Sequence, residues 1–142
     1  MTIAAILRGK GQEVVSVTPD DTVRAAVALL AQRRIGAVPV MDGATVAGIF
    51  SERDVIYCLQ DVDAGVLDRT VRKVMTAPAI TVAPTDPVLG ALSLMTQRRI
   101  RHLPVVDGGR LVGFVSIGDL VKYRIDRVEA DANAMRSYIQ QA

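Results

Sequence analysis

Apolar residues follow two spacings along this chain, and the same succession of spacings occurs twice. Short apolar runs that end near a proline predict brief strands at 14–17 and 79–82. After each run, apolar residues recur at i, i+3, i+4 and i+7, which is the spacing of one face of a helix. These helical positions are Val23, Ala26, Val27 and Leu30 in the first half, and Val88, Ala91, Leu92 and Met95 in the second.

A hairpin and a further helix follow each of these predicted helices. Apolar runs at 37–41 and 103–106 lead into turn sequences at 42–43 and 107–109, and second apolar arms follow at 46–50 and 111–115. Ser51 and Ser116 then stand where another helix begins. Each half therefore reads as strand, helix, strand, hairpin strand, helix.

The two halves are copies of one sequence. The segment from Gly48 to Asp54 (GIFSERD) matches the segment from Gly113 to Asp119 (GFVSIGD) at an offset of 65 residues. The same offset superposes 32–35 on 97–100 (QRRI in both) without a gap. A unit of this size buries too little apolar surface to be stable alone, so we expect the two copies to pack together. The predicted fold is α/β (α+β): two repeats related by a pseudo-twofold axis, each a small three-stranded sheet with two helices.

The repeat also divides the chain into segments. We expect a first repeat with its lead-in at 1–66, a second repeat with a linker helix at 67–124, and a helical tail at 125–142. Residues 68–75 suit a short amphipathic helix, with a counterpart at 3–7. The apolar stripe of the tail is expected to pack on a partner subunit or on the protein's own core.

Composition excludes several classes of function. The formal net charge is +2, aromatic residues make up 4% of the chain, and Trp is absent, which disfavours nucleic-acid binding. One cysteine, Cys58, supplies neither an internal disulfide nor a multi-cysteine metal site. The longest strictly apolar stretch, Ala25–Ala31, is too short to span a bilayer. We therefore expect a cytoplasmic protein without membrane contact.

These motifs resemble the cystathionine β-synthase (CBS) domain pair, or Bateman module, in its stand-alone bacterial form. The marks are the two Gly-apolar-apolar-Ser-x-x-Asp segments, the apolar-Pro-Val strands around Pro39 and Pro104, and the sequence Val-Met-Thr at 74–76. The resemblance runs from about residue 3 to residue 124.

The resemblance implies a regulatory ligand site in a cleft between the repeats. Its ligands would be adenosine derivatives: AMP, ADP or ATP, with NAD and S-adenosylmethionine as further options. It also implies a homodimer, or a dimer of dimers, that regulates an unidentified protein. No catalytic role is expected. The chain has no P-loop, no HExxH and no room for the barrel of the IMP dehydrogenases, enzymes in which this module also occurs.

The Ser-x-x-Asp segments have two compatible interpretations. Ser51 with Asp54, and Ser116 with Asp119, suit a variant capping box at a helix start. The same helix starts offer free N–H groups to a phosphate, and a carboxylate has two acceptor oxygens for adjacent ribose hydroxyls.

Further candidate ligand-binding residues lie near these helix starts. Apolar side chains that would sandwich a flat base are Val17, Ile35, Ala37, Val82 and Ile100. Main-chain groups that would read the base edge belong to Ser16, Val17, Thr18, Thr81, Val82 and Ala83. The remaining candidates at the strand entries are Gly36, Pro39 and Pro104.

The copies differ at positions suited to phosphate. Arg101 and His102 stand where the first copy has Gly36 and Ala37, and the resemblance makes them candidate phosphate contacts. Arg53 is the candidate cation of the first copy, although a surface ion pair with a neighbouring acid would account for this arginine equally well. For His102 the alternative is a half-exposed strand residue without a role in binding. We expect the two sites to differ, with the Asp119 site preferring ligands of higher phosphate charge. The competing hypothesis is a dimerisation scaffold with degenerate sites.

Overall fold

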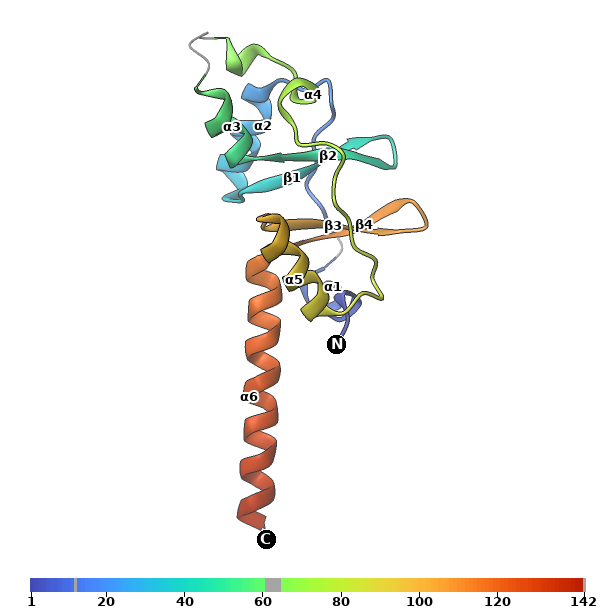
Figure 1. Cartoon of the computed structure of the whole chain (residues 1–142), viewed down its shortest axis with the longest axis vertical. Coiled ribbons are helices and arrows are strands. Elements are labelled where there is room, and N and C mark those ends of the chain that lie inside the picture. Colours follow the sequence, from blue (N-terminus) through green and yellow to red (C-terminus); the bar gives the residue numbers. More distant parts are fainter. Residues whose placement is uncertain (12, 61–64, 142) are drawn as a thin grey trace.

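Two antiparallel hairpins form the centre of the protein (Figure 1). The computed structural model describes residues 1–11, 13–60 and 65–141. The first hairpin joins β1 (Ala37–Asp42) to β2 (Thr45–Ser51), and the second joins β3 (His102–Asp107) to β4 (Arg110–Ser116). Strands β2 and β4 contact each other, so the hairpins of the two repeats pack together. The predicted α/β fold with two related halves is confirmed.

The third strand predicted for each sheet is reduced to a single parallel bridge, which corrects that part of the prediction. Val17 donates its N–H to the Pro39 carbonyl (3.2 Å) and accepts from the Met41 N–H (2.8 Å). The next donor, the Thr18 N–H, is taken by the Asp21 carboxylate at 2.9 Å. Proline follows and has no N–H, so the ladder cannot continue. The bridge of Val82 to β3 repeats this pattern.

The helix before each hairpin ends in an unusual conformation that both copies share. Helices α2 (Val23–Arg33) and α5 (Val88–Arg98) are followed by Arg34 and Arg99, with φ of 53° and 54°. Left-handed backbone is uncommon for a residue with a side chain. Its recurrence 65 residues apart supports the duplication and brings both arginines to the strand entries.

Each repeat has its own apolar core, and the segment that precedes each repeat in the sequence packs into the core of the other repeat. Helix α1 (Ile3–Lys10) packs its apolar face into the core of the second repeat, with Val88 and Leu103. The turn η1 (Val66–Asp68) and helix α4 (Val71–Val74) pack into the core of the first repeat, with Phe50. The segment boundaries drawn along the chain stay a prediction. In space, each repeat is completed by a segment that precedes the other.

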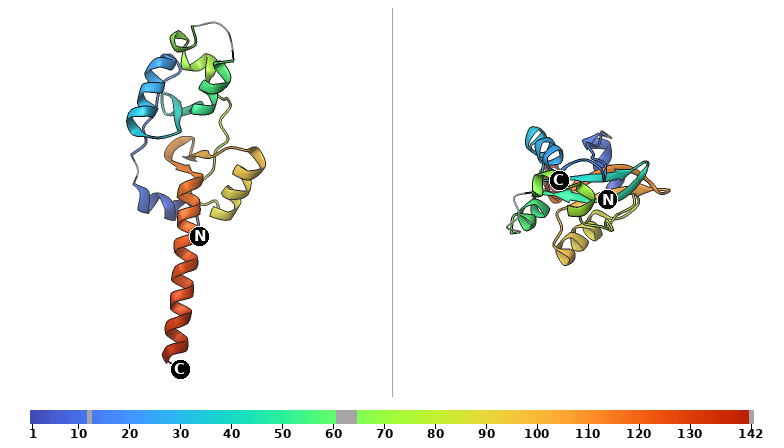
Figure 2. Two further views of the ribbon diagram at one scale, coloured as in Figure 1. Left: turned by 90° about the vertical axis from the view of Figure 1, so that its left-hand side faces the viewer. Right: turned by 90° about the horizontal axis from the view of Figure 1, so that it is seen from above.

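Helices α3 (Glu52–Cys58) and α6 (Ile117–Gln141) begin at the ends of the two hairpins. The predicted tail helix is confirmed, and it is continuous with the helix that Ser116 begins. Most of α6 projects away from the rest of the protein, as both side views show (Figures 1 and 2). Among the described residues, no helix combines the length and the apolar character needed to cross a bilayer.

Candidate functional site: two clefts between the repeats

The start of α3 places a carboxylate between the repeats. Ser51 caps the helix, its N–H donates to Oδ2 of Asp54 at 2.8 Å, and the Asp54 N–H returns a bond to the Ser51 hydroxyl at 3.4 Å. The predicted capping box is therefore present. The second oxygen of Asp54, Oδ1, accepts from the Thr76 hydroxyl at 2.8 Å. Asp54 is the one charged residue that is buried among the described residues, and every contact named here is to a neutral donor.

The Asp54 cleft, a cavity of about 270 Å³, draws its walls from both repeats. The first repeat contributes the start of α3, and the second contributes residues 98–102, where α5 turns into β3. Its lining residues are Gly36, Ala37, Ile49, Ser51, Glu52, Arg53, Asp54, Tyr57, Thr76, Arg98, Arg99, Ile100, Arg101 and His102. The cleft therefore has both of its walls only when the two repeats are packed together.

Positive charge is concentrated in the Asp54 cleft. Four of its lining residues are arginines, at positions 53, 98, 99 and 101. The Arg53 guanidinium donates to the main-chain carbonyl of Arg99 at 2.7 Å, which ties α3 to the other repeat. Arg101 lies 3.9 Å from the Glu52 carboxylate, and both side chains are more than half exposed. The residues that line this cleft thus include arginines of both repeats, beside the carboxylates of Glu52 and Asp54.

The Asp119 cleft is the pseudo-symmetric counterpart, with a volume of about 470 Å³. Here the start of α6 faces residues 34–37, where α2 turns into β1. Its lining residues are Lys10, Gly11, Glu13, Val14, Val15, Arg34, Ile35, Gly36, Ala37, His102, Phe114, Ser116 and Asp119. Its cations are Lys10 and Arg34, so it carries less positive charge than the Asp54 cleft.

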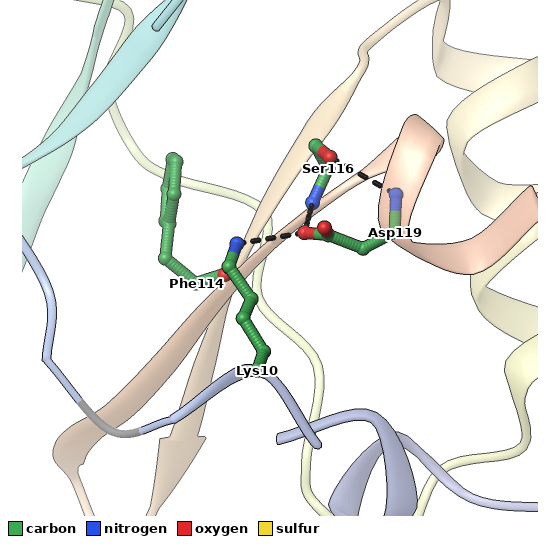
Figure 3. Close-up of polar contacts among 4 residues, drawn as sticks. All are labelled: Lys10, Phe114, Ser116 and Asp119. Atoms are coloured by element: carbon green, nitrogen blue, oxygen red, sulfur yellow. Dashed lines mark hydrogen bonds and ion pairs between the residues drawn. The ribbon is translucent and has the colours of Figure 1, made fainter. Parts of the chain in front are cut away.

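Lys10 holds the carboxylate of the Asp119 cleft (Figure 3). Its Nζ donates to Oδ2 of Asp119 at 2.7 Å and to the Phe114 carbonyl at 2.7 Å, while the Ser116 N–H donates to the same carboxylate oxygen at 2.9 Å. Burial by itself raises the pKa of Asp119. The hydrogen bonds from Lys10 and Ser116 outweigh burial and hold the pKa below its usual value.

His102 lies where the two clefts meet, since it lines both. Its ring stacks on Phe114 with centroids 5.6 Å apart and an interplanar angle of 17°. Burial, together with the charges of Arg101 and Lys10, lowers the pKa of His102. The lowered pKa favours the uncharged imidazole, which can form hydrogen bonds but carries no positive charge.

The structure brings most of the predicted strand-entry and helix-start residues into the clefts. In the Asp54 cleft these are Gly36, Ala37, Ser51, Arg53, Asp54, Ile100, Arg101 and His102. In the Asp119 cleft they are Ile35, Gly36, Ala37, His102, Ser116 and Asp119. Arg101 thus lines the Asp54 cleft, because each helix start faces the strand entry of the opposite repeat. Arg101 therefore adds its positive charge to the Asp54 cleft, and not to the Asp119 cleft of its own repeat as the sequence suggested.

Eight predicted residues do not line either cleft. They are Ser16, Val17, Thr18, Pro39, Thr81, Val82, Ala83 and Pro104. The side chains of Val17 and Val82 belong to the cores, and their main-chain groups are used in the bridges to β1 and β3. The residues that line the Asp119 cleft instead are Val14 and Val15, which lie just before the predicted position.

Lys10 and Thr76 were missed as site residues, although the repeat itself carries the signal. The offset of 65 residues superposes 9–11 on the Val-Met-Thr sequence at 74–76. Lys10 therefore corresponds to Met75, and Gly11 corresponds to Thr76. Extension of the repeat toward the N-terminus shows that residues 9–11 and 74–76 occupy equivalent positions before their repeats, which would have marked both segments as candidates.

We expect Lys10→Met, which installs the residue of the equivalent position, to raise the pKa of Asp119. A carboxylate with a lowered pKa stabilises the folded state above its unfolded pKa of about 3.9, and this contribution is lost as the pH falls toward the folded pKa. Loss of the Lys10 bond should therefore lower the free energy of unfolding at neutral pH, and this free energy should fall less steeply as the pH drops below the unfolded pKa. Carbon-detected NMR titration of the Asp119 carboxyl and urea unfolding across pH 3–7 measure the two effects.

Lys73→Met is the matched control, because Lys73 is exposed on α4 and the substitution removes the same charge. It should leave the titration of Asp119 unchanged. An Asp119 titration that is the same in Lys10→Met and in the unsubstituted protein would contradict the ion pair.

A model of the CBS domain matches the chain over residues 11–61 and 71–126. The mitochondrial CBS domain-containing protein CBSX3 of Arabidopsis thaliana is 34% identical over 148 residues, covering 98% of this chain and 72% of that protein. The inosine-5'-monophosphate dehydrogenase of Mycobacterium tuberculosis is 40% identical over 118 residues, which is 80% of this chain and 21% of the enzyme.

Solved structures share the fold. The crystal structure of a CBS-domain protein from Agrobacterium tumefaciens superposes with a TM-score of 0.83 and 37% identity, covering 87% of this chain and 99% of that one. A CBS-domain protein from Pyrobaculum aerophilum, complexed with AMP, superposes with a TM-score of 0.73 and 31% identity, covering 84% of this chain and 89% of that one.

Proposed function

The chain belongs to the CBS-domain family and carries two copies of the domain in tandem, and from this premise we propose that it is a regulatory module that binds adenine nucleotides between its repeats. The ligand would be AMP, ADP or ATP. Similar domain pairs support an adenosine ligand, because the Pyrobaculum protein and a structure named CBSX2 were each solved with AMP.

The observation that carries the proposal is the composition of the Asp54 cleft. A buried carboxylate at a helix start shares one cavity with four arginines, one beside it on α3 and three from the other repeat. The carboxylate accepts from a hydroxyl, Thr76, at 2.8 Å, and a ribose hydroxyl offers the same chemistry. Arginine binds phosphate oxygens through two parallel N–H groups. The cleft therefore provides for both the sugar and the phosphates of a nucleotide.

The same comparison reverses the expected order of the two sites. We assign the ligand with more phosphate charge to the Asp54 cleft rather than to the Asp119 cleft, because Arg101 reaches across to the opposite helix start. In the Asp119 cleft, Lys10 already neutralises the carboxylate. That cleft suits a nucleoside or a monophosphate.

Regulation would follow from the position of the clefts. Since each cleft has walls from both repeats, a bound nucleotide links them and changes the free energy of their relative placement. A homodimer would transmit that change to a regulated protein. The competing scaffold hypothesis requires clefts that bind none of these ligands.

Calorimetric titration of AMP and ATP tests the assignment. In Arg101→Ala we expect ATP to bind at least about tenfold more weakly, since a charge-assisted contact contributes on the order of 1.5–3 kcal/mol. Asp54→Asn should weaken both nucleotides at the same cleft. Arg110→Ala is the matched control, because Arg110 is exposed at the turn of the second hairpin, and it should bind as the unsubstituted protein does.

Thermal shift separates this proposal from the scaffold. Each ligand that binds the folded state raises the melting temperature by mass action. If AMP, ADP, ATP, NAD and S-adenosylmethionine all leave the melting temperature unchanged, the nucleotide-binding proposal fails.

A further inference from the structure

The outer part of α6 has an apolar face that nothing in the described chain covers. Within this helix only Leu120 is buried, and every residue from Arg124 to Gln141 is exposed. Figures 1 and 2 show this part of the helix standing clear of the hairpins and of the other helices. The exposed side chains include Ile125, Met135 and Ile139, with 51%, 61% and 64% of their surface accessible.

These apolar side chains follow a strict coiled-coil spacing. Along α6, apolar residues recur in alternating steps of four and three positions. They are Val121, Ile125, Val128, Ala132, Met135 and Ile139. Steps of four and three give a period of 3.5, which keeps one stripe facing a partner helix along its whole length. The stripe extends over about three heptads, the shortest length at which such a pattern indicates a coiled coil.

Charged residues flank the stripe in complementary order. The flanking positions hold Lys122, Arg124, Glu129, Asp131, Arg136 and Tyr138, and four of these, Arg124, Glu129, Asp131 and Arg136, meet one another between two copies. Between two parallel copies, Arg124 meets Glu129 and Asp131 meets Arg136. Between two antiparallel copies, Arg124 meets Asp131 and Glu129 meets Arg136. Both directions pair opposite charges only, and ion pairs at these positions determine partner choice in coiled coils.

We propose that the α6 stripe is a self-association surface, on which a second copy of this chain lays the same helix to form a two-stranded coiled coil. The stripe lies beyond the hairpins, so the protein's own core does not reach it. A membrane surface is disfavoured because Glu129 and Asp131 interrupt the basic residues that border the stripe, whereas helices that lie on anionic membranes carry mainly Lys and Arg there. The surface is distinct from both clefts and needs no nucleotide.

A charge exchange tests the proposal in either direction of pairing. Glu129→Arg with Asp131→Arg makes the four flanking positions that pair between copies basic, and Arg124→Glu with Arg136→Glu makes the same four acidic. Each double variant should associate with itself at least about tenfold more weakly than the unsubstituted chain, as judged by analytical ultracentrifugation. An equimolar mixture should restore association as a heterodimer. Unchanged self-association of both variants would overturn the proposal.

Cysteine cross-linking identifies the helices themselves as the interface, in case the repeats also associate. The native thiol is first removed by Cys58→Ser. Parallel helices place Ala132 opposite Ala132 of the second copy, and antiparallel helices place Ala132 opposite Val128 of the second copy. Ala132→Cys alone should therefore form a disulfide dimer under mild oxidation, or else a mixture of Ala132→Cys and Val128→Cys chains should. Ser137→Cys, on the outer face of the helix, is the control. The absence of both cross-links at the stripe would overturn the proposal, whatever happens to nucleotide binding.

Discussion

Replacing Phe50 with alanine is expected to lower the free energy of unfolding by about 3–5 kcal/mol, the usual cost of deleting a fully buried aromatic ring. Phe50 has no exposed surface and packs with Val38, Val40 and Val71 in the core of the first repeat. Because α4 is part of that core, the cavity also loosens the segment that carries Thr76 into the Asp54 cleft. Equilibrium unfolding in urea measures the loss.

Phe114→Ala is the matched comparison, since the chain has two phenylalanines and this one is only partly buried. Its ring stacks on His102 beside the Asp119 cleft. An aromatic pair of this kind contributes about 0.5–1.5 kcal/mol beyond the area it buries. We expect a much smaller loss of stability than for Phe50. Equal losses for the two variants would show that the ring of Phe50 does not occupy the core.

Gly48→Ala should destabilise the protein by about 1–3 kcal/mol, the range for overpacking a well-packed site. A Cβ at Gly48 would lie 2.6 Å from the Thr76 carbonyl oxygen and 3.0 Å from the Met75 sulfur. That carbonyl accepts from the Ile49 N–H at 2.9 Å, so the backbone of the linker would have to move away from β2. Thr76 would move with it, and nucleotide affinity at the Asp54 cleft should fall as well.

Gly113→Ala is the equivalent substitution in the second repeat. There the three atoms nearest to the added Cβ all belong to the side chain of Leu7, and the closest is a methyl group at 2.5 Å. A side-chain end rotates away more easily than a backbone carbonyl moves, so we expect a smaller loss of stability and no effect on the Asp54 cleft. Thermal unfolding and AMP titration of both variants make the comparison. A larger loss for Gly113→Ala would contradict this account of Gly48.

The helices and hairpins were predictable because their signals are local. The turn at Asp42-Gly43 adopts positive φ at Gly43, and the four-residue capping box of Ser51 and Asp54 forms as its spacing indicates. Both depend on residues that are adjacent in sequence. The duplication strengthened every such assignment, since each local pattern occurs twice.

The bridges at Val17 and Val82 show where local signals were insufficient. An apolar run that ends in proline is typical of a strand, but a strand also needs a partner for each main-chain group. Here the donor after Val17 is taken by Asp21, and the donor after Val82 is taken by Asp86. The number of ladder bonds therefore depends on which acceptors lie nearby in the folded chain.

The clefts depend on tertiary structure even more strongly. Arg101 lies in the cleft of Asp54, and Lys10 lies in the cleft of Asp119 at a separation of 109 residues along the chain. No spacing within one repeat indicates these pairs. Arg101 meets the Asp54 cleft because the pseudo-twofold packing sets each helix start against the strand entry of the other repeat. Lys10 meets Asp119 because α1, which precedes the first repeat, packs into the core of the second.

From the order of its residues alone, this chain specifies a duplicated α/β unit, the caps of its helices, and the presence of a carboxylate at each of two helix starts, because periodicity and capping act over a few neighbouring residues. The tertiary structure determines which cation lies beside each carboxylate, how much charge each cleft carries, and which side chains are buried in the cores. Those properties depend on contacts between segments far apart in sequence, and such contacts exist only once the two repeats have packed.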